Sequence, residues 1–306
     1  MQKNVSKEKK KTLRKRYFFM FCFLVFPIVN FLVFYVYANF NSIVMAFQRP
    51  IYDGGEGYVW TLDNFKRIVE LFGSAGGGVL TEALINTVLF WISGMLIGLP
   101  ISVLSCYFFF VKIPGSKLFR AVMYLPNIIT SSALVVLFKY AIGYGGPLDA
   151  LASRMGIEYI YPLTEKPFAI LTIIFYSVMF GFGTNIILIG GAMNGINVEM
   201  LEAARIDGCN WFQELTRIIL PTIWPTVSTI IILSLASLLG STGPILAFTK
   251  GEAGTMTLSF YIYKLVSGVG TGVTDLNLAC AVGLAMTVVS LPFVFIVKRI
   301  VYGKEE

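Results

Sequence analysis

A short polar segment in the second half of the sequence carries the residue types that could do chemistry. Glu202 and Asp207 offer negative charge, while Ala203 and Ala204 leave room for another surface to approach closely. A compact polar segment of this kind is suited to docking with a partner. A folded connector between two longer helices explains the same residues equally well, because a short helical link is common.

The rules of helix formation predict two short helices joined by a sharp turn in this segment. Asn197 is placed to cap the first helix, and Gly208 to end it in the left-handed conformation. Asn210 starts the second helix, and Gln213 three residues later completes the pattern of a capping box. Pro221 is expected to begin a further helix, since its missing N–H needs no partner at that position. The segment is therefore predicted to be folded.

Several kinds of chemistry are disfavoured by residues that the sequence lacks. There is no histidine, and no acidic residue lies within the six long uncharged stretches, whereas proton relays normally use intramembrane Asp, Glu or His. No phosphate-binding loop of the type G-x-x-x-x-G-K-[ST] occurs, so energy from ATP would have to come from another chain. The four cysteines lie in predicted spans or in a cytoplasmic loop and predict no metal or redox site. The chain is predicted not to be an enzyme, with no cofactor of its own.

The composition predicts that the elements positioning this segment lie in a membrane. Of 306 residues, 56% are hydrophobic and 13% charged, whereas soluble domains carry about 25% charged residues. Six gaps between charges are each long enough for a helix that crosses the hydrocarbon core. The predicted fold class is an all-α membrane protein with six transmembrane helices. The predicted spans cover residues 17–39, 83–110, 120–142, 168–192, 221–247 and 276–298.

The distribution of basic residues predicts the orientation. The segments on the side of the termini carry 16 Lys and Arg, eight of them in residues 1–16, and the opposite segments carry 8. The positive-inside rule therefore places both termini in the cytoplasm. This bias also accounts for the net charge of +7, so no nucleic-acid partner is expected. A signal peptide is disfavoured for the first span, because the apolar run 17–38 is too long and bulky and lacks a cleavage pattern.

At the polar segment the sequence resembles the integral membrane permease subunits of binding-protein-dependent ABC importers. Their hallmark is the EAA loop, with E-A-A, two residues, D-G-A and then about nine residues to I-x-L-P. The matching positions are Glu202, Ala203, Ala204, Asp207, Gly208, Ile218, Leu220 and Pro221. Two departures are Cys209 in place of alanine and Leu215 where an aromatic residue is common. Weaker similarities at 118–126, 146–151 and 257–263 point to the branch that imports sugars and related solutes.

The resemblance implies a type I importer permease fold and a mechanism. The EAA loop, residues 198–220, would form coupling helices that dock on a cytoplasmic ATPase, with Glu202, Ala203, Ala204, Asp207 and Gly208 as the coupling residues. The implied partners are a second homologous permease, two ATPase subunits that hold ATP and Mg, an external solute-binding protein, a sugar, and the lipid bilayer. The implied location is the bacterial cytoplasmic membrane. Which sugar is carried stays open, and glycerol phosphate or a polyol-like solute remains an alternative cargo.

Candidates for the translocation path are polar residues within the predicted spans. They are Tyr124, Asn127, Thr184, Asn185, Ser237, Ser241 and Thr242. Each of them has a competing explanation, because Ser, Thr and Asn in spanning helices usually bond a neighbouring helix or their own backbone. The stretch 240–244 is a stronger pointer, since broken backbone at membrane depth lines a cavity or packs on protein. Phe180 and Phe182 could stack on a sugar ring or simply pack.

The predicted organisation is a single membrane domain. Residues 1–16 form a basic cytoplasmic segment, 17–300 the permease domain and 301–306 a cytoplasmic tail. The longest outer segment, 40–82, is too short to fold alone and is predicted to hold one short helix near Leu62–Leu71. The alternative function is a stand-alone ion-coupled transporter or channel. Neighbouring genes for a second permease and a binding protein would favour the importer, and flux driven by a cation gradient would favour the alternative.

Overall fold

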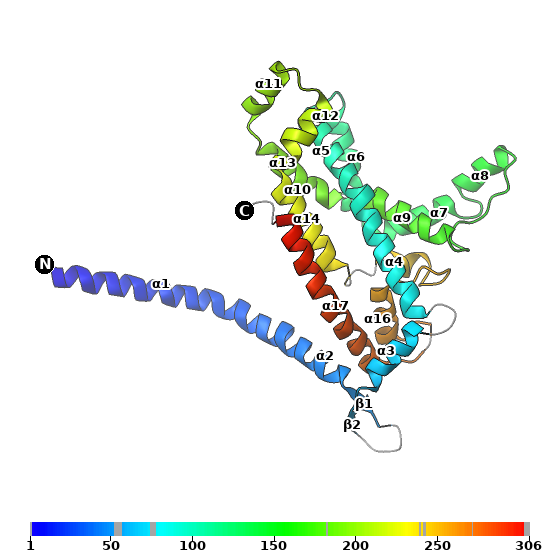
Figure 1. Ribbon diagram of the computed structural model, residues 1–306, viewed down its shortest axis with the longest axis horizontal. Helices are drawn as coiled ribbons and strands as arrows, with labels where there is room; N and C mark the ends of the chain where they lie inside the picture. Colours follow the sequence, from blue (N-terminus) through cyan, green and yellow to red (C-terminus); the bar gives the residue numbers. More distant parts are fainter. Residues whose placement is uncertain are drawn as a thin grey trace. The chain divides into compact units, whose positions relative to one another are not determined.

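The computed structural model describes residues 2–51, 57–73, 78–181, 183–238, 240, 243–270 and 272–302, with side chains from residue 13 onward. Apart from one two-stranded hairpin, the regular structure of this described chain is helical (Figure 1). The chain divides into an N-terminal unit, Met1–Arg67 with Asp275–Leu284, and a central unit, Ile68–Thr274 with Ala285–Glu306.

The N-terminal unit begins with a continuous helical run. It consists of α1 (Gln2–Asn30), a π-helical stretch η1 (Phe31–Tyr37) and α2 (Ala38–Ala46). A hairpin follows, with β1 (Gln48–Pro50) antiparallel to β2 (Tyr58–Trp60). Helix α3 (Asp63–Gly73) comes next and confirms the short helix predicted near Leu62–Leu71.

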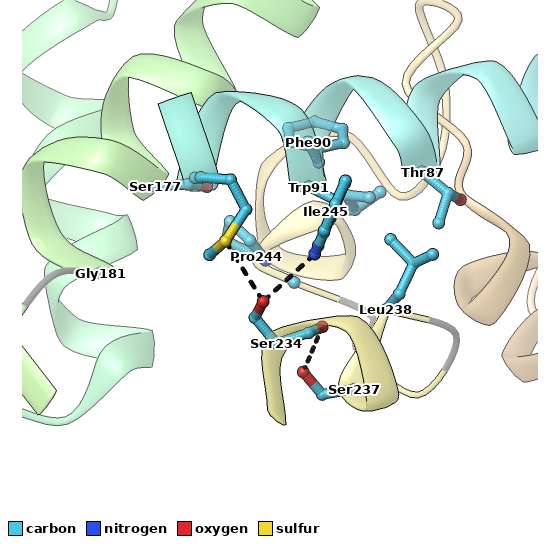
Figure 2. Close-up of a pocket in the computed structure, with 13 residues that line it drawn as sticks. Thr87, Phe90, Trp91, Ser177, Gly181, Ser234, Ser237, Leu238, Pro244 and Ile245 are labelled. Carbon is cyan, nitrogen blue, oxygen red and sulfur yellow. Dashed lines mark hydrogen bonds between the residues drawn. The ribbon is translucent and has the colours of Figure 1, made fainter. Parts of the chain in front are cut away.

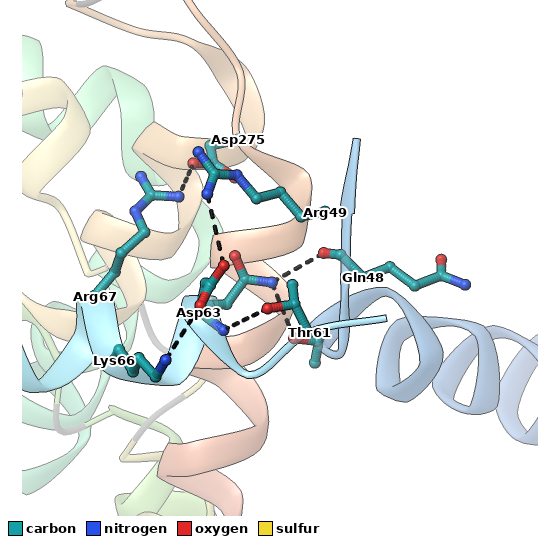
Figure 3. Close-up of polar contacts among 9 residues, drawn as sticks. Gln48, Arg49, Thr61, Asp63, Lys66, Arg67 and Asp275 are labelled. Atoms are coloured by element: carbon teal, nitrogen blue, oxygen red, sulfur yellow. Dashed lines mark hydrogen bonds and ion pairs between the residues drawn. The ribbon is translucent and has the colours of Figure 1, made fainter. Parts of the chain in front are cut away.

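Polar side chains fix the hairpin to the start of α3 (Figure 3). Asn64, only 1% exposed, donates from its amide to the carbonyl oxygens of Ala46 and Gln48, both at 3.0 Å. Arg67 pairs with Asp275 at 2.9 Å, which ties α3 to the start of the last helix. A buried amide with two backbone acceptors is satisfied and strongly positioned. The unit is therefore held by specific polar contacts as well as by packing.

The central unit contains the remaining helices, and the last of them begins within the N-terminal unit. They are α4 (Val79–Ser93), η2 (Gly94–Gly98), α5 (Leu99–Phe110), α6 (Ser116–Ile128), α7 (Ser131–Ile142), α8 (Pro147–Arg154), α9 (Phe168–Gly181), α10 (Gly183–Asn194), α11 (Val198–Ile206), α12 (Trp211–Gln213), η3 (Glu214–Ile219), α13 (Leu220–Thr222), α14 (Trp224–Ser237), α15 (Ile245–Phe248), α16 (Leu258–Ser267) and α17 (Leu276–Tyr302).

Five helical segments of the described chain are long and apolar enough to cross a membrane. They are Leu13–Ala46, Val79–Phe110, Ser131–Arg154, Phe168–Asn194 and Leu276–Tyr302. A sixth is obtained if Trp211–Thr222 and Trp224–Ser237, which meet at an angle of 70°, form one bent span. The fold class predicted from the sequence, an all-α membrane protein with six spans, agrees with this arrangement.

Two of the predicted spans are not single helices as expected. The stretch predicted at 120–142 is broken where Ile129 and Thr130 adopt extended conformations, so that α6 ends and α7 begins. The stretch predicted at 221–247 contains α14, which already ends at Ser237, and Gly243 and Pro244 lie in a turn. These two turn residues agree with the predicted break in the backbone at 240–244.

The start of the bent span also differs from the prediction. Pro221 lies inside a continuous helical run, directly after the π-helical stretch η3, and does not begin a new helix. The break comes two residues later at Ile223, and α14 begins there with Pro225 in its first turn. Pro225 lacks the N–H that would bond back to the preceding turn, which accounts for the bend at this point.

The main hydrophobic core of the central unit joins α5, α10, the polar segment and α14. Its fully buried members include Ile189, Met193, Ile219 and Ile223. A second core joins α7, α9 and α15 around Ile173. The polar segment thus packs in the same hydrophobic core as the membrane-spanning helices α5, α10 and α14.

Candidate functional site

The polar segment forms an elbow of two short helices, and the predicted caps are present. The side chain of Asn197 accepts from the backbone N–H of Glu199 at 2.9 Å. Gly208 has φ +83°, the left-handed conformation predicted for it. Asn210 and Gln213 form a reciprocal capping box at 2.9 and 3.1 Å. With each of its two helices capped at its start, the elbow has a defined shape.

An ion pair that the sequence analysis missed closes the elbow. Arg205 on α11 donates from Nε and Nη2 to the two carboxylate oxygens of Glu214, both at 2.9 Å. The Glu214 side chain is 4% exposed, whereas that of Arg205 is 48% exposed. The hydrogen bonds to Glu214 raise the pKa of Arg205, which stays charged. Arg205 and Glu214 are nine residues apart, on either side of a turn. This spacing is not one at which residues face each other on a helix, so the sequence pattern does not predict the pair.

Apolar anchors hold one face of the elbow to the membrane core, while the other face is exposed. Leu201 and Leu215 are buried in the main core. On the outer face, Glu202, Ala203, Asp207 and Gly208 are exposed and Ala204 is half-buried. Ile206 is 86% exposed, an unusual position for a large apolar side chain in an ordered turn of helix. Helix α11 and the turn after it hold the five predicted coupling residues. This helix lies at one end of the central unit, beside α12 (Figure 1).

A cavity of about 380 Å³ lies among α4, η2, α9 and α14 (Figure 2). We call it the serine cavity, and its described lining consists of Thr87, Phe90, Trp91, Gly94, Met95, Ser177, Gly181, Ser234, Ser237, Leu238, Gly243, Pro244 and Ile245. The indole N–H of Trp91 donates to the hydroxyl of Ser234 at 3.3 Å. The buried hydroxyl oxygen of Ser177 has no hydrogen-bond partner among the residues that the structure describes. A buried hydroxyl without a partner is a group that a polar ligand could satisfy.

A second cavity of about 710 Å³ adjoins the serine cavity and shares four lining residues with it: Ser177, Gly181, Gly243 and Pro244. Its other wall contains Tyr176 and Phe180, which belong to an aromatic cluster with Phe138 and Phe248. The ring centroids of Tyr176 and Phe180 are 4.8 Å apart. Phe180 therefore both packs on aromatic neighbours and faces a cavity. Phe182 lies outside the described residues.

No charged side chain is among the described residues that line these two cavities. The polar side-chain groups of this described lining are hydroxyls, one indole N–H and one amide. Ionic groups in such surroundings would lack a counter-charge and would be costly to bury. The arrangement suits a neutral solute rich in hydroxyl groups.

The predicted path residues are distributed over different places. Ser237 lines the serine cavity, and its hydroxyl donates to the carbonyl of Ser234 at 3.0 Å. Asn127 lines the second cavity and packs so closely on Gly183 that a Cβ there would lie 1.6 Å from Nδ2. Tyr124 lines a separate cavity near the elbow.

The other predicted path residues have no cavity assigned to them. Thr184 and Asn185 line none of the cavities described here, and Ser241 and Thr242 lie outside the described residues. Trp91, Ser177 and Ser234 line the serine cavity but were missed. Isolated serines and a tryptophan in a spanning helix look like packing residues unless the neighbouring helices are known.

Asn86 and Thr87 hold the loop before α16 in place. The Asn86 amide donates to the carbonyls of Gly254 and Met256 at 2.7 and 2.8 Å, and Thr87 Oγ1 accepts from the backbone N–H of Leu258 at 3.0 Å. Both residues are buried. These contacts give both residues a role in packing, and Thr87 also lines the serine cavity.

Comparison with known proteins decides the family. The model of the binding-protein-dependent transport system inner membrane component matches residues 75–303, about three quarters of the chain. The chain belongs to this family. Its members are transport permeases rather than enzymes, and the chain is accordingly a multi-pass inner-membrane protein.

Individual relatives are similar along most of their length. The chain is 26% identical to the probable ABC transporter permease protein YesP of Bacillus subtilis (strain 168), over 84% of this chain and 83% of that protein. It is 28% identical to the lactose transport system permease protein LacF of Rhizobium radiobacter, over 76% and 78%. A chain of a bacterial alginate ABC transporter, solved in complex with an alginate pentasaccharide-bound periplasmic protein, superposes with a TM-score of 0.78 at 25% identity, covering 92% of this chain and 93% of that one.

Proposed function

We propose that this chain is the permease subunit of an ATP-driven importer that moves a carbohydrate into the cell by alternating access. The lactose permease LacF and the multiple sugar-binding permease MsmF are among its relatives, which supports a carbohydrate cargo. The uncharged, hydroxyl-bearing lining of the two adjoining cavities supports the same cargo on independent grounds. The sugar would pass between the aromatic cluster and the serine cavity.

The observation that carries the energy-coupling part of the proposal is the elbow. Its outer face exposes Ala203, Ile206 and Asp207, while its inner face is fixed by Leu201 and by the Arg205–Glu214 pair. A rigid projection with an exposed apolar tip can transmit force from a partner that grips it. We take the partner to be a cytoplasmic ATPase, with Glu202, Ala203, Ala204, Asp207 and Gly208 at the contact and ATP and Mg held by the ATPase.

The complete importer would contain further chains. The described part of the chain provides one elbow and five or six candidate spans, which is half of what the importer would need. We therefore expect a second homologous permease together with two ATPase subunits. An external solute-binding protein would deliver the sugar at the other face of the membrane, away from the elbow. Both termini would then lie in the cytoplasm.

Uptake by cells that express the intact importer tests this function. We expect uptake of a labelled neutral sugar to stop when ATP is depleted and to continue when an ionophore collapses the cation gradients. Replacing Ile206 with Glu should abolish uptake while the chain remains in the membrane at normal level, because the change affects an exposed tip. Uptake that follows the cation gradient and survives ATP depletion would instead support the ion-coupled alternative and refute the proposal.

A further inference from the structure

Two other cavities form one groove at the end of the central unit that carries the elbow. The outer cavity, about 610 Å³, is lined by residues from the end of α5, the start of α6 and the end of α10. The inner cavity, about 210 Å³, lies between α5, α6 and α10. They share Phe109, Phe110, Arg120 and Asn194, so they are continuous. This basic groove is separate from the two cavities assigned to the sugar, with which it shares no described lining residue.

The rim of the basic groove is positively charged without compensation. Lys112, Lys117 and Arg120 line it, and no acidic residue is among its described lining. None of the three forms an ion pair with a carboxylate in the described part of the chain. Three cations around one cavity repel one another unless an anion lies between them.

The backbone and one aromatic ring add to this preference for an anion. Gly115, with φ +84°, precedes the 13-residue helix α6 and provides no side chain to cap its first turn. The N–H groups of that turn and the helix dipole favour a negative charge at this end. The guanidinium of Arg120 lies 5.5 Å from the centroid of the buried Phe109 ring, which fixes its position on the groove wall.

Below the charged rim, apolar side chains form part of the groove wall beside Arg120, Tyr124 and Asn194. The apolar part of this inner wall includes Cys106, Ile186 and Ile187, and Gly190 and Gly191 contribute no side chain that would fill the cavity. A Cβ placed on Gly191 would meet no atom within 4 Å, so there is open space at this point. A small anion would use only the rim. A molecule with a phosphate at one end and a hydrocarbon chain at the other would use both parts.

We propose that the basic groove binds an anionic phospholipid, with its phosphate between Lys112, Lys117 and Arg120 and an acyl chain in the inner cavity. The positive-inside rule explains why basic residues occur on the cytoplasmic side. It does not explain why these three residues surround a cavity, or why a second cavity continues inward from it. Asn194, on the groove wall, lies three residues before the elbow cap Asn197. An occupied groove therefore fills the space beside the helix end from which the elbow projects.

Native mass spectrometry of the intact importer tests the site. The probes are phosphatidylglycerol, phosphatidylcholine and inorganic phosphate. We expect the wild-type complex to retain phosphatidylglycerol in preference to phosphatidylcholine, and K112Q/K117Q/R120Q to lower the affinity for phosphatidylglycerol at least about tenfold, as expected for the removal of three surface cations. The matched control is R217Q/K298Q/R299Q, which removes three exposed basic residues of the described chain that do not line the groove.

A second variant tests the inner cavity. Gly191→Leu should fill the inner cavity and weaken phosphatidylglycerol binding while leaving the charged rim intact. Equal loss of binding in the rim variant and in the control would mean general surface attraction and would overturn the proposal. So would displacement of the lipid by millimolar inorganic phosphate, which would indicate a site for small anions, or unchanged lipid binding in Gly191→Leu complexes that transport normally.

Discussion

Removing one partner of the Arg205–Glu214 pair should loosen the elbow without unfolding the protein. In Arg205→Met the carboxylate of Glu214, 4% exposed, loses two hydrogen bonds of 2.9 Å. Leaving a fully buried charge unpaired costs roughly 3–5 kcal/mol, and breaking an exposed pair costs less than about 1 kcal/mol. Because Arg205 is 48% exposed and water can replace part of it, we expect a cost of about 2 kcal/mol.

This cost should appear as local opening. About 2 kcal/mol corresponds to a roughly 30-fold increase in the opening equilibrium. Hydrogen exchange of the intact importer should therefore speed up by that factor at Asp207 and Cys209, whose N–H groups bond to the carbonyls of Ala203 and Ala204 at 3.0 Å. Uptake per ATP hydrolysed should fall, because a loosened elbow transmits less of the ATPase motion.

Two further variants separate the pair from the rest of the loop. Arg217→Met removes an exposed arginine of the same loop that has no ion-pair partner in the described chain, and it should leave exchange unchanged. Arg205→Met combined with Glu214→Leu removes the stranded charge and should recover most of the protection. Exchange at the elbow that is unaltered in Arg205→Met, or equally raised in Arg217→Met, would refute the reasoning.

Three other changes have expected outcomes. Gly208→Val, at φ +83°, should cost about 1–2 kcal/mol of stability and uncouple ATP hydrolysis from uptake. Gly208→Asn should retain coupling, because asparagine tolerates this backbone conformation. Uptake and ATP hydrolysis are both measured in reconstituted vesicles. Trp91→Phe removes the N–H that Ser234 accepts and should raise the KM for sugar uptake about fivefold at normal membrane levels, a loss of about 1 kcal/mol. Asn64→Ala deprives two backbone carbonyls of their donor and should lower stability by about 2 kcal/mol in thermal unfolding, whereas removal of the exposed Asn39 amide should have little effect.

The elbow was predicted well because its signals are local. The caps at Asn197 and Asn210 and the turn at Gly208 depend on residues within a few positions of each other, and each lies where it was predicted. The spans were recognised from the long gaps between charges. Their ends and breaks were less accurate, because the break at Ile129 depends on backbone conformation that apolar residues do not signal.

The cavities and the ion pair could not be read from the sequence for a different reason. Trp91 and Ser234 meet across 143 positions, and Arg205 reaches Glu214 around a turn. Nothing in the types or spacing of these residues distinguishes them from ordinary packing residues. Only the packing of the helices brings them together, so tertiary contact has to be known before their roles can be assigned.

The loop before α16 has a consequence for how such proteins diverge. Asn86 and Thr87 fix it through main-chain atoms of Gly254, Met256 and Leu258, and these atoms are present whatever the side chains are. Outward-pointing positions of the loop, such as the exposed Glu252, can therefore change over evolution without moving the loop itself. The outer side chains and the framework beneath them can therefore change independently of one another.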